Sequence, residues 1–252
     1  MATPVFVHGK NTRLIYANTT TNKTQDISGY FNDASVSRAI EATDTTAFQT
    51  GGVKTYITGL KEGVISLSGM YEGSTNGLDA LLTDAIYTAG DKGVIVFPQG
   101  GQTSDNERCY MAVGINTKYD LKSPVSGVVA ADTEIQSDGG VWAGRGSFIT
   151  VPSSGYTTAP RDHTYGQTTA GGLLIMGITS ITGGATVSLS FQHSQTGSSW
   201  VTPTGGTLAT ETGVGTAISQ LTGTIYEYTR LVATVTGGTN PSATIYFGFA
   251  RY

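Results

Sequence analysis

The 252-residue sequence has few charged residues and lacks several features of common functional classes. Charged side chains make up 13% of the chain, about half the usual share. Cys109 is the only cysteine, which excludes a disulfide within the chain and fits synthesis in a reducing cytoplasm. No run of eighteen apolar residues occurs, so we expect no membrane-spanning segment. The net charge of -4 disfavours a nucleic-acid binder, because binding phosphates requires clustered lysines and arginines.

Motifs for catalysis or cofactor binding are also missing from the sequence. The three histidines, His8, His163 and His193, lie in different regions, and none belongs to a nucleophile or metal motif. The glycine-rich segments do not end in the Gly-Lys-Ser/Thr of a phosphate-binding loop, and the carboxylates lack calcium-loop spacing. We therefore predict no catalytic residues, no cofactor-binding residues, no metal ligands and no enzymatic activity.

The composition favours strands. The chain contains 35 glycines and 41 threonines, and 38% of its residues are hydrophobic. Threonine, valine, isoleucine and tyrosine suit pleated strands, and glycine suits the tight turns between them. Residues 187–193 and 243–249 alternate between apolar and small polar side chains, which is typical of strands with one buried face. We expect a mostly β protein.

One segment has the periodicity of an amphipathic helix. Five apolar residues follow the i, i+3, i+4, i+7, i+8 spacing of a one-sided stripe. Asn76 is a candidate N-cap, Asp79 falls in the first turn, and Gly90 is a candidate for the left-handed closing position. The sequence therefore predicts one helix packed on a β-sandwich or barrel through Leu78, Leu81, Leu82, Ala85 and Ile86.

The charge distribution divides the chain into two parts. Fifteen of the eighteen acidic residues and eleven of the fourteen basic residues lie before residue 151. Residues 151–172 are rich in proline, serine, threonine and glycine, as linkers and long loops are. We expect one domain over residues 1–152 and a second, small antiparallel β-sandwich over residues 153–252.

The surface pattern favours assembly. Strands with serine, threonine and glycine on the outer face carry few of the charges that prevent edge-to-edge pairing. Ring formation would close such edges. The polar stretch 42–53 is a candidate arm that reaches an adjacent subunit, with a plain surface loop as the alternative. Its predicted contact residues are Thr43, Asp44, Thr45, Thr46, Ala47, Phe48 and Gln49.

Residues 5–150 resemble the major tail tube proteins of long-tailed bacteriophages. The resemblance lies in the order of segments: an early strand with Asp-Ile-Ser and Tyr-Phe-Asn at 26–32, and a Glu-x-Thr stretch that enters a long loop. A Gly59-Leu60 turn, an amphiphilic strand that ends at Tyr71-Glu72, and a single helix follow. Residues 153–252 resemble the Ig-like β-modules that phage tail and capsid proteins carry on their exterior.

The resemblance implies a tail-tube β-sandwich or half-barrel with a flanking helix, followed by an Ig-like antiparallel β-sandwich. Six subunits would form a ring, and stacked rings would form the hollow tail tube through which DNA passes into the host without specific binding. The tape measure, tail terminator and distal tail proteins would be further partners, and no membrane would be bound. The chain would be made in the host cytoplasm and located in the virion tail. The surplus of carboxylates in the first part leads us to expect a net negative lumen.

Two other functional classes remain open from the sequence. A two-domain carbohydrate-binding or adhesin-like protein could use Trp142, Trp200 and several tyrosines as sugar platforms, although aromatic residues at strand positions are more often core residues. A hydrolase with an unrecognised site is the other class. Tubes or stacked rings formed by the purified protein would separate the first reading from both.

Overall fold

The computed structural model describes residues 9–46, 53–75, 77–101, 107–153, 155–162 and 166–252. These residues form a mostly β structure of antiparallel sheets with a single α-helix, which confirms the predicted fold class. The chain divides into two compact units, and each unit is built from separate segments of the sequence. We call residues 1–29, 89–111 and 142–252 the sandwich unit, and residues 30–88 and 112–141 the hairpin unit.

The first sheet of the sandwich unit joins strands from the whole length of the chain. A short 3-10 helix, Gly9–Asn11, precedes its first strand. The strand order is β14-β11-β16-β8-β6-β5-β1-β2. The strands are β1 (Arg13–Asn18), β2 (Lys23–Asp26), β5 (Lys92–Phe97), β6 (Glu107–Lys122), β8 (Trp142–Val151), β11 (Gly172–Thr182), β14 (Gly215–Leu221) and β16 (Ser242–Arg251).

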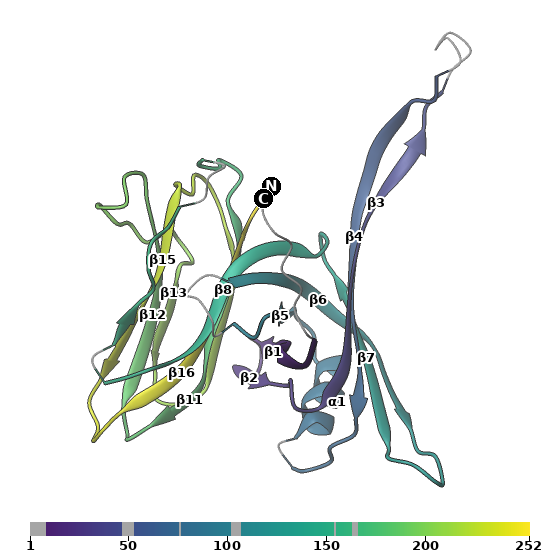
Figure 1. The fold of residues 1–252 in the computed structure, drawn as a ribbon, viewed down its shortest axis with the longest axis horizontal. Helices are drawn as coiled ribbons and strands as arrows, with labels where there is room; N and C mark the ends of the chain where they lie inside the picture. The colour runs from purple at the N-terminus through teal and green to yellow at the C-terminus, as the bar shows by residue number, and fades with distance from the viewer. Residues whose placement is uncertain (1–8, 47–52, 76, 102–106, 154, 163–165) are drawn as a thin grey trace. The chain divides into compact units, whose positions relative to one another are not determined.

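The second sheet of this unit packs against β8, β11, β14 and β16 of the first sheet and completes a β-sandwich (Figure 1). Its strands are β9 (Tyr156–Thr157), β10 (Arg161–Asp162), β12 (Thr186–Ser194), β13 (Thr207–Glu211) and β15 (Tyr228–Thr236). The rings of Phe191 on β12 and Phe249 on β16 lie 4.6 Å apart between the two sheets. The alternation at 187–193 and 243–249 therefore marks the two buried faces, as predicted.

A buried polar cluster joins three strands of the first sheet. The hydroxyl of Tyr246 on β16 lies 2.8 Å from the hydroxyls of Thr24 on β2 and Thr216 on β14. Burial raises the pKa of Tyr246 to about 12. Because buried polar groups are costly without hydrogen bonds, this cluster stabilises one arrangement of the three strands.

The hairpin unit is a four-stranded sheet with one helix. Its strand order is β3 (Phe31–Asp44), β4 (Tyr56–Met70), β7 (Ala130–Ser137) and the C-terminal part of β6. Its buried apolar side chains come from α1 (Leu78–Tyr87), β4, β6 and β7, and from Val141. The hydroxyl of Tyr119 on β6 donates a hydrogen bond of 2.9 Å to Asp79 in the first turn of α1.

The helix begins at Leu78, one residue later than expected if Asn76 were the N-cap. Gly77 occupies the N-cap position, where it offers no side chain, and Asn76 lies outside the described residues. Glu72 takes over the role, since its carboxylate accepts hydrogen bonds from the backbone N–H groups of Ser74 at 2.8 Å and Leu78 at 3.0 Å. Hydrogen bonding by the Ser74 side chain, and then by the two backbone N–H groups, lowers the pKa of Glu72. The helix ends at Tyr87, and Gly90 adopts a φ of 100° beyond it.

Four of the five predicted packing residues of the helix are buried. They are Leu78, Leu81, Leu82 and Ala85. Ile86 is 38% exposed, in contrast to the prediction. At about 100° per residue, Ile86 lies roughly 80° around the helix from Leu78, at the flank of the stripe.

The chain divides differently from the expected domains 1–152 and 153–252. Strand β8, which precedes that boundary, pairs with β16 at the C-terminus over residues 145–151 and 243–249. The hairpin unit is inserted within the sandwich unit rather than preceding it. The expected boundary followed the composition of the loop after β8. Composition does not reveal hydrogen bonds between strands that are about 100 residues apart.

Candidate assembly surface

The β3–β4 hairpin has two halves with different surroundings (Figure 1). Over residues 64–70, β4 pairs with β3 on one side and β7 on the other. Over residues 56–63, β4 pairs with β3 alone among the described strands. We call residues 38–44 and 56–63 the distal hairpin. It is a two-stranded ribbon, and such a ribbon is at best marginally stable in water by itself.

Large apolar side chains are exposed along the distal hairpin. The exposed fractions are 56% for Ile40, 56% for Tyr56, 58% for Ile57 and 76% for Leu60. By contrast, Ile65 and Leu67, further along β4, are buried. A cluster of exposed apolar side chains on an unsupported ribbon is typical of a surface that a partner covers.

The strand register distributes these side chains over both faces of the ribbon. Ile40 is opposite Lys61, and Tyr56 is opposite Asp44, which places Ile40 and Tyr56 on one face. Ile57 is opposite Thr43 and therefore points to the other face. The register shifts by one residue between these pairs, because β4 contains a bulge that includes Leu60. A partner must therefore contact both sides of the ribbon to bury all four side chains.

The described members of the predicted contact set, Thr43, Asp44, Thr45 and Thr46, lie at the far end of the distal hairpin. Thr43 and Asp44 are paired residues of β3, so the stretch that was expected to be an arm or a surface loop begins within a strand. Thr45 and Thr46 follow the strand. The Thr45 N–H donates to the carbonyl of Thr55 at 2.9 Å, and the Thr46 N–H donates to the Asp44 carboxylate at 2.8 Å. Contacts with Thr46 lower the pKa of Asp44.

Ala47, Phe48 and Gln49, the other predicted contact residues, lie outside the described residues. The four exposed apolar residues were missed, and Gly59 and Leu60, which were expected to form a turn, lie within β4. The signal that could have found Tyr56, Ile57 and Leu60 is the charge and glycine content of 56–63, which is incompatible with a strand buried on either face.

The hairpin unit also carries a charged sheet face. The register places Asp120 of β6 opposite Asp132 of β7, and Lys118 of β6 opposite Glu134 of β7. Lys122 lies 2.5 Å from Asp132, and hydrogen bonding by Lys122 lowers the pKa of Asp132. Lys118 lies 3.2 Å from Asp120. Three carboxylates therefore share two lysines on this face, which leaves it net negative.

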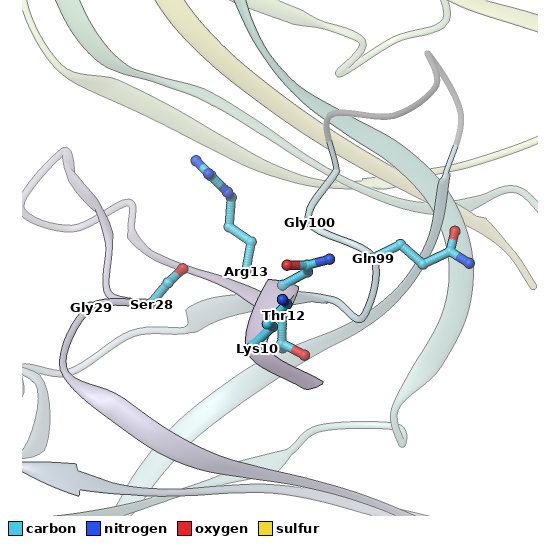
Figure 2. A pocket seen from close by; sticks show the side chains of 8 residues that line it. Lys10, Thr12, Arg13, Ser28, Gly29, Gln99 and Gly100 are labelled. Carbon is cyan, nitrogen blue, oxygen red and sulfur yellow. The ribbon is translucent and has the colours of Figure 1, made fainter. Parts of the chain in front are cut away.

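A polar cavity of about 510 Å³ lies in the sandwich unit (Figure 2). The described residues that line it include no histidine, cysteine or carboxylate. Arg13 pairs with Asp26 at 2.9 Å and covers the ring of Phe148 at 3.9 Å. Ser28 accepts a hydrogen bond from the Leu14 N–H at 2.8 Å. The Ser28 hydroxyl and N–H also donate to the Asp26 carboxylate, at 2.5 Å and 3.0 Å, so these side chains hold the turn after β2. The lining residues are Lys10, Asn11, Thr12, Arg13, Ser28, Gly29, Gln99 and Gly100.

The cysteine and the one described histidine are buried in the protein interior. Cys109 is buried, and burial raises the pKa of its thiol to about 12, so the reactive thiolate is disfavoured at neutral pH. His193 is buried, and its Nδ1 accepts a hydrogen bond from the Tyr226 N–H at 3.0 Å. His8 and His163 lie outside the described residues. Among the described residues, no group of three histidine, cysteine or acidic side chains is placed to hold a metal ion.

Both tryptophans have ring partners within the sandwich unit. The ring of Trp142 lies 4.6 Å from that of Tyr252, and the guanidinium of Arg230 lies 4.1 Å from the centre of the Trp200 ring. Each indole therefore contacts another side chain of the same unit. Within the described part of the chain, no helix combines the length and the apolar character that crossing a bilayer requires.

No known protein family and no curated protein matches this sequence. The fold is similar to a chain in the tail of an empty gene transfer agent particle with C6 symmetry, with 17% identity over 53% of this chain and 96% of that chain and a TM-score of 0.43. It is similar to the SPP1 tail tube protein at 9% identity, 54% and 78% coverage and a TM-score of 0.44. It is also similar to the SPP1 Dit protein at 11% identity, 95% and 99% coverage and a TM-score of 0.38.

Proposed function

We propose that this chain is a structural virion protein that assembles into a phage tail tube. Six copies form a ring, as the sequence resemblance implies, and rings stack into a hollow tube for DNA delivery. The observation that carries this proposal is the distal hairpin, a two-stranded ribbon that exposes Ile40, Tyr56, Ile57 and Leu60.

A second copy of the chain is the partner that best fits this hairpin. The edge of β3 has no described strand partner, so its backbone N–H and C=O groups can pair with another strand. A cyclic arrangement buries the same ribbon on every subunit and leaves no subunit with an open edge. A partner on each side would also cover both faces of the ribbon, as the distribution of Ile40 and Ile57 requires.

The charged sheet face of the hairpin unit suits the wall of a DNA channel. Its carboxylates, Asp120, Asp132 and Glu134, outnumber its two lysines. A net negative surface repels phosphates, so DNA passes without being held. The hairpin unit as a whole has eleven acidic residues and five basic residues, in keeping with this role.

The tube requires other tail proteins at its ends and inside it. We assign the tape measure, tail terminator and distal tail proteins as these partners, and the virion tail as the location after synthesis in the host cytoplasm. Residues 153–252 contribute the larger part of the sandwich, and we assign them as an Ig-like module on the outside of the tube. All of these assignments follow from the tail-tube resemblance.

Electron microscopy with negative stain and light scattering of the purified protein test the proposal. We expect rings or stacked rings with a central hole, and a mass of about six subunits for the smallest ring. Dispersed monomers at high concentration contradict the proposal. Dispersed monomers that bind glycans would instead support the carbohydrate-binding alternative.

A matched pair of variants ties the assembly to the hairpin. Leu60→Ser removes an apolar side chain from the distal hairpin, and we expect it to prevent ring formation. Val125→Ser removes an exposed apolar side chain outside the hairpin, and we expect rings to form as in the wild type. Equal assembly of both variants would show that the hairpin is not the interface.

A further inference from the structure

Three arginines of the sandwich unit lie close enough for their charges to interact. Arg108 on β6 is directly opposite Arg145 on β8, so their side chains leave the sheet on the same face. Arg161 on β10 comes from the opposing sheet, and its charge acts on Arg145. Arg108 is exposed, whereas Arg145 and Arg161 are half-buried. We call these three residues the arginine cluster.

The arginine cluster lacks the partners that other arginines of this unit have. Arg13 pairs with Asp26, and Arg251 donates to the carbonyl of Tyr226 at 2.6 Å. Among the described residues, no hydrogen bond or ion pair involves the guanidinium groups of the cluster, and the Nε of Arg161 is buried without a partner. Burial, together with the charges of Arg161 and Arg108, lowers the pKa of Arg145.

The close approach of three arginine charges is electrostatically unfavourable unless an anion binds to them. Like charges directly opposite each other on paired strands repel, and partly buried charges need a counter-charge or hydrogen bonds to offset their desolvation. Guanidinium groups recognise carboxylates by paired, charge-assisted hydrogen bonds. The arginine cluster can therefore bind one or two carboxylates.

The hairpin unit supplies carboxylates of the required kind. The sandwich unit has nine basic and seven acidic residues, whereas the hairpin unit has five basic and eleven acidic residues. Glu62 is opposite Ala39 on the distal hairpin, and Glu41 follows Ala39 by two residues, so both glutamates lie on the same face. Both side chains are exposed. Two carboxylates thus stand together on the ribbon that we propose as the contact between copies.

We propose that the arginine cluster of one copy binds Glu41 and Glu62 on the distal hairpin of a second copy. This contact rests on the proposed ring assembly and adds the residues that determine how neighbours are oriented. The hairpin supplies the apolar area through Leu60 and Ile57, and the glutamates and arginines select the partner surface.

Charge reversal tests this contact. Arg145→Glu and Glu62→Arg each place like charges together, and we expect the concentration needed for assembly to rise about tenfold or more. The neutral variant Arg145→Gln should have a smaller effect of the same sign. Lys23→Glu is the control, because it changes the net charge equally at an exposed site on β2 and should assemble normally. Thermal unfolding of each monomer verifies that the variants fold.

A mixing experiment shows whether the contact joins two copies. The double variant Arg145→Glu/Glu62→Arg should assemble like the wild type. An equimolar mixture of the two single variants should also assemble, as alternating copies, because each interface then has opposite charges. Rescue in the double variant without rescue in the mixture would place the contact within one chain and overturn the proposal.

The outcomes separate this contact from the proposed function. If the wild type forms no rings, the tail-tube function fails and the contact with it. If the wild type forms rings and Arg145→Glu forms them at the same concentration, the contact alone is overturned. Loss of assembly in Arg145→Glu with rescue by mixing supports both.

Discussion

The sandwich core and the distal hairpin differ in how their apolar side chains are covered. In the sandwich, side chains from two sheets cover each other, and Phe191 and Phe249 are almost completely buried. In the distal hairpin, side chains of similar size, such as Leu60 and Ile57, are more than half exposed. The first region satisfies its own folding requirements. The second exposes large apolar side chains and has no second layer to cover them, which is the condition that subunit assembly can complete.

The difference is sharpest within one strand. Leu60 and Leu67 both lie on β4, seven residues apart, yet Leu60 is 76% exposed and Leu67 is buried. The strand pairs with β7 at Leu67 but not at Leu60. One strand therefore serves the fold at one end and, by our proposal, assembly at the other.

The largest expected effect on folding is in the sandwich core. Phe191→Ala removes a buried ring that contacts Phe249 at 4.6 Å. We expect the free energy of unfolding to fall by about 3–5 kcal/mol, because the contacts are lost and a cavity remains. Urea unfolding of the monomer measures this change. A loss below about 1 kcal/mol would show that the two sheets do not depend on this packing.

A smaller effect is expected in the polar cluster of the same unit. Tyr246→Phe removes the hydroxyl that lies 2.8 Å from both Thr24 and Thr216. We expect a loss of about 1 kcal/mol, since each threonine hydroxyl retains a backbone carbonyl as acceptor. Urea unfolding of Tyr246→Phe, measured in parallel with Phe191→Ala, compares the two losses of free energy of unfolding. An increase in stability would show that the cluster is not a favourable feature.

The sandwich unit should also have a pH-dependent element. Burial and the nearby charge of Arg251 lower the pKa of His193 below 6.5, and its Nδ1 must stay unprotonated to accept from the Tyr226 N–H. Neutral His193 is therefore favoured in the folded state. Stability should be highest above pH 6.5 and fall as the pH drops below that value, because the unfolded chain then binds the proton more readily.

His193→Gln checks this assignment, because glutamine retains an acceptor oxygen but does not titrate. The difference in melting temperature between wild type and variant should shrink or reverse between pH 7 and pH 5. A pH-independent difference would assign the acid sensitivity to groups other than His193.

The smallest effect on folding is expected in the distal hairpin. Leu60→Ala should change monomer stability by no more than about 0.5 kcal/mol, as is usual for exposed positions. Leu67→Ala, the matched change in the same strand, should cost about 2–5 kcal/mol. Parallel urea unfolding curves provide the test. Similar losses for both variants would mean that the monomer itself already covers Leu60.

The spacing of apolar residues correctly predicted individual strands and the helix. The alternation at 187–193 and 243–249 identified buried strand faces, and the stripe through Leu78 and Leu82 identified the helix. In each case the period of the side chains matches the geometry of the element. Ile86 was misassigned because the stripe has a finite width and the helix ends one residue later.

Long-range pairing was not accessible in the same way. The hydrogen bonds between β8 and β16 join residues about 100 positions apart. Neither strand has a sequence feature that identifies the other as its partner. The domain boundary at 152 therefore followed composition rather than pairing. The arginine cluster was missed for the same reason, since Arg108, Arg145 and Arg161 meet only after three separate strands are in register. The contact role of residues 43–49 stays a prediction, and the pairing of residues 42–44 with β4 was not predicted.

Hydrogen–deuterium exchange of the β3–β4 hairpin tests the central claim most directly. In the isolated subunit, we expect backbone amides of residues 38–44 and 56–63 to exchange rapidly, while those of β12 and β16 stay protected. In assembled rings, the hairpin amides should become protected, and those of the sandwich should not change. Full protection of the distal hairpin in the monomer, or no gain of protection on assembly, would contradict the account.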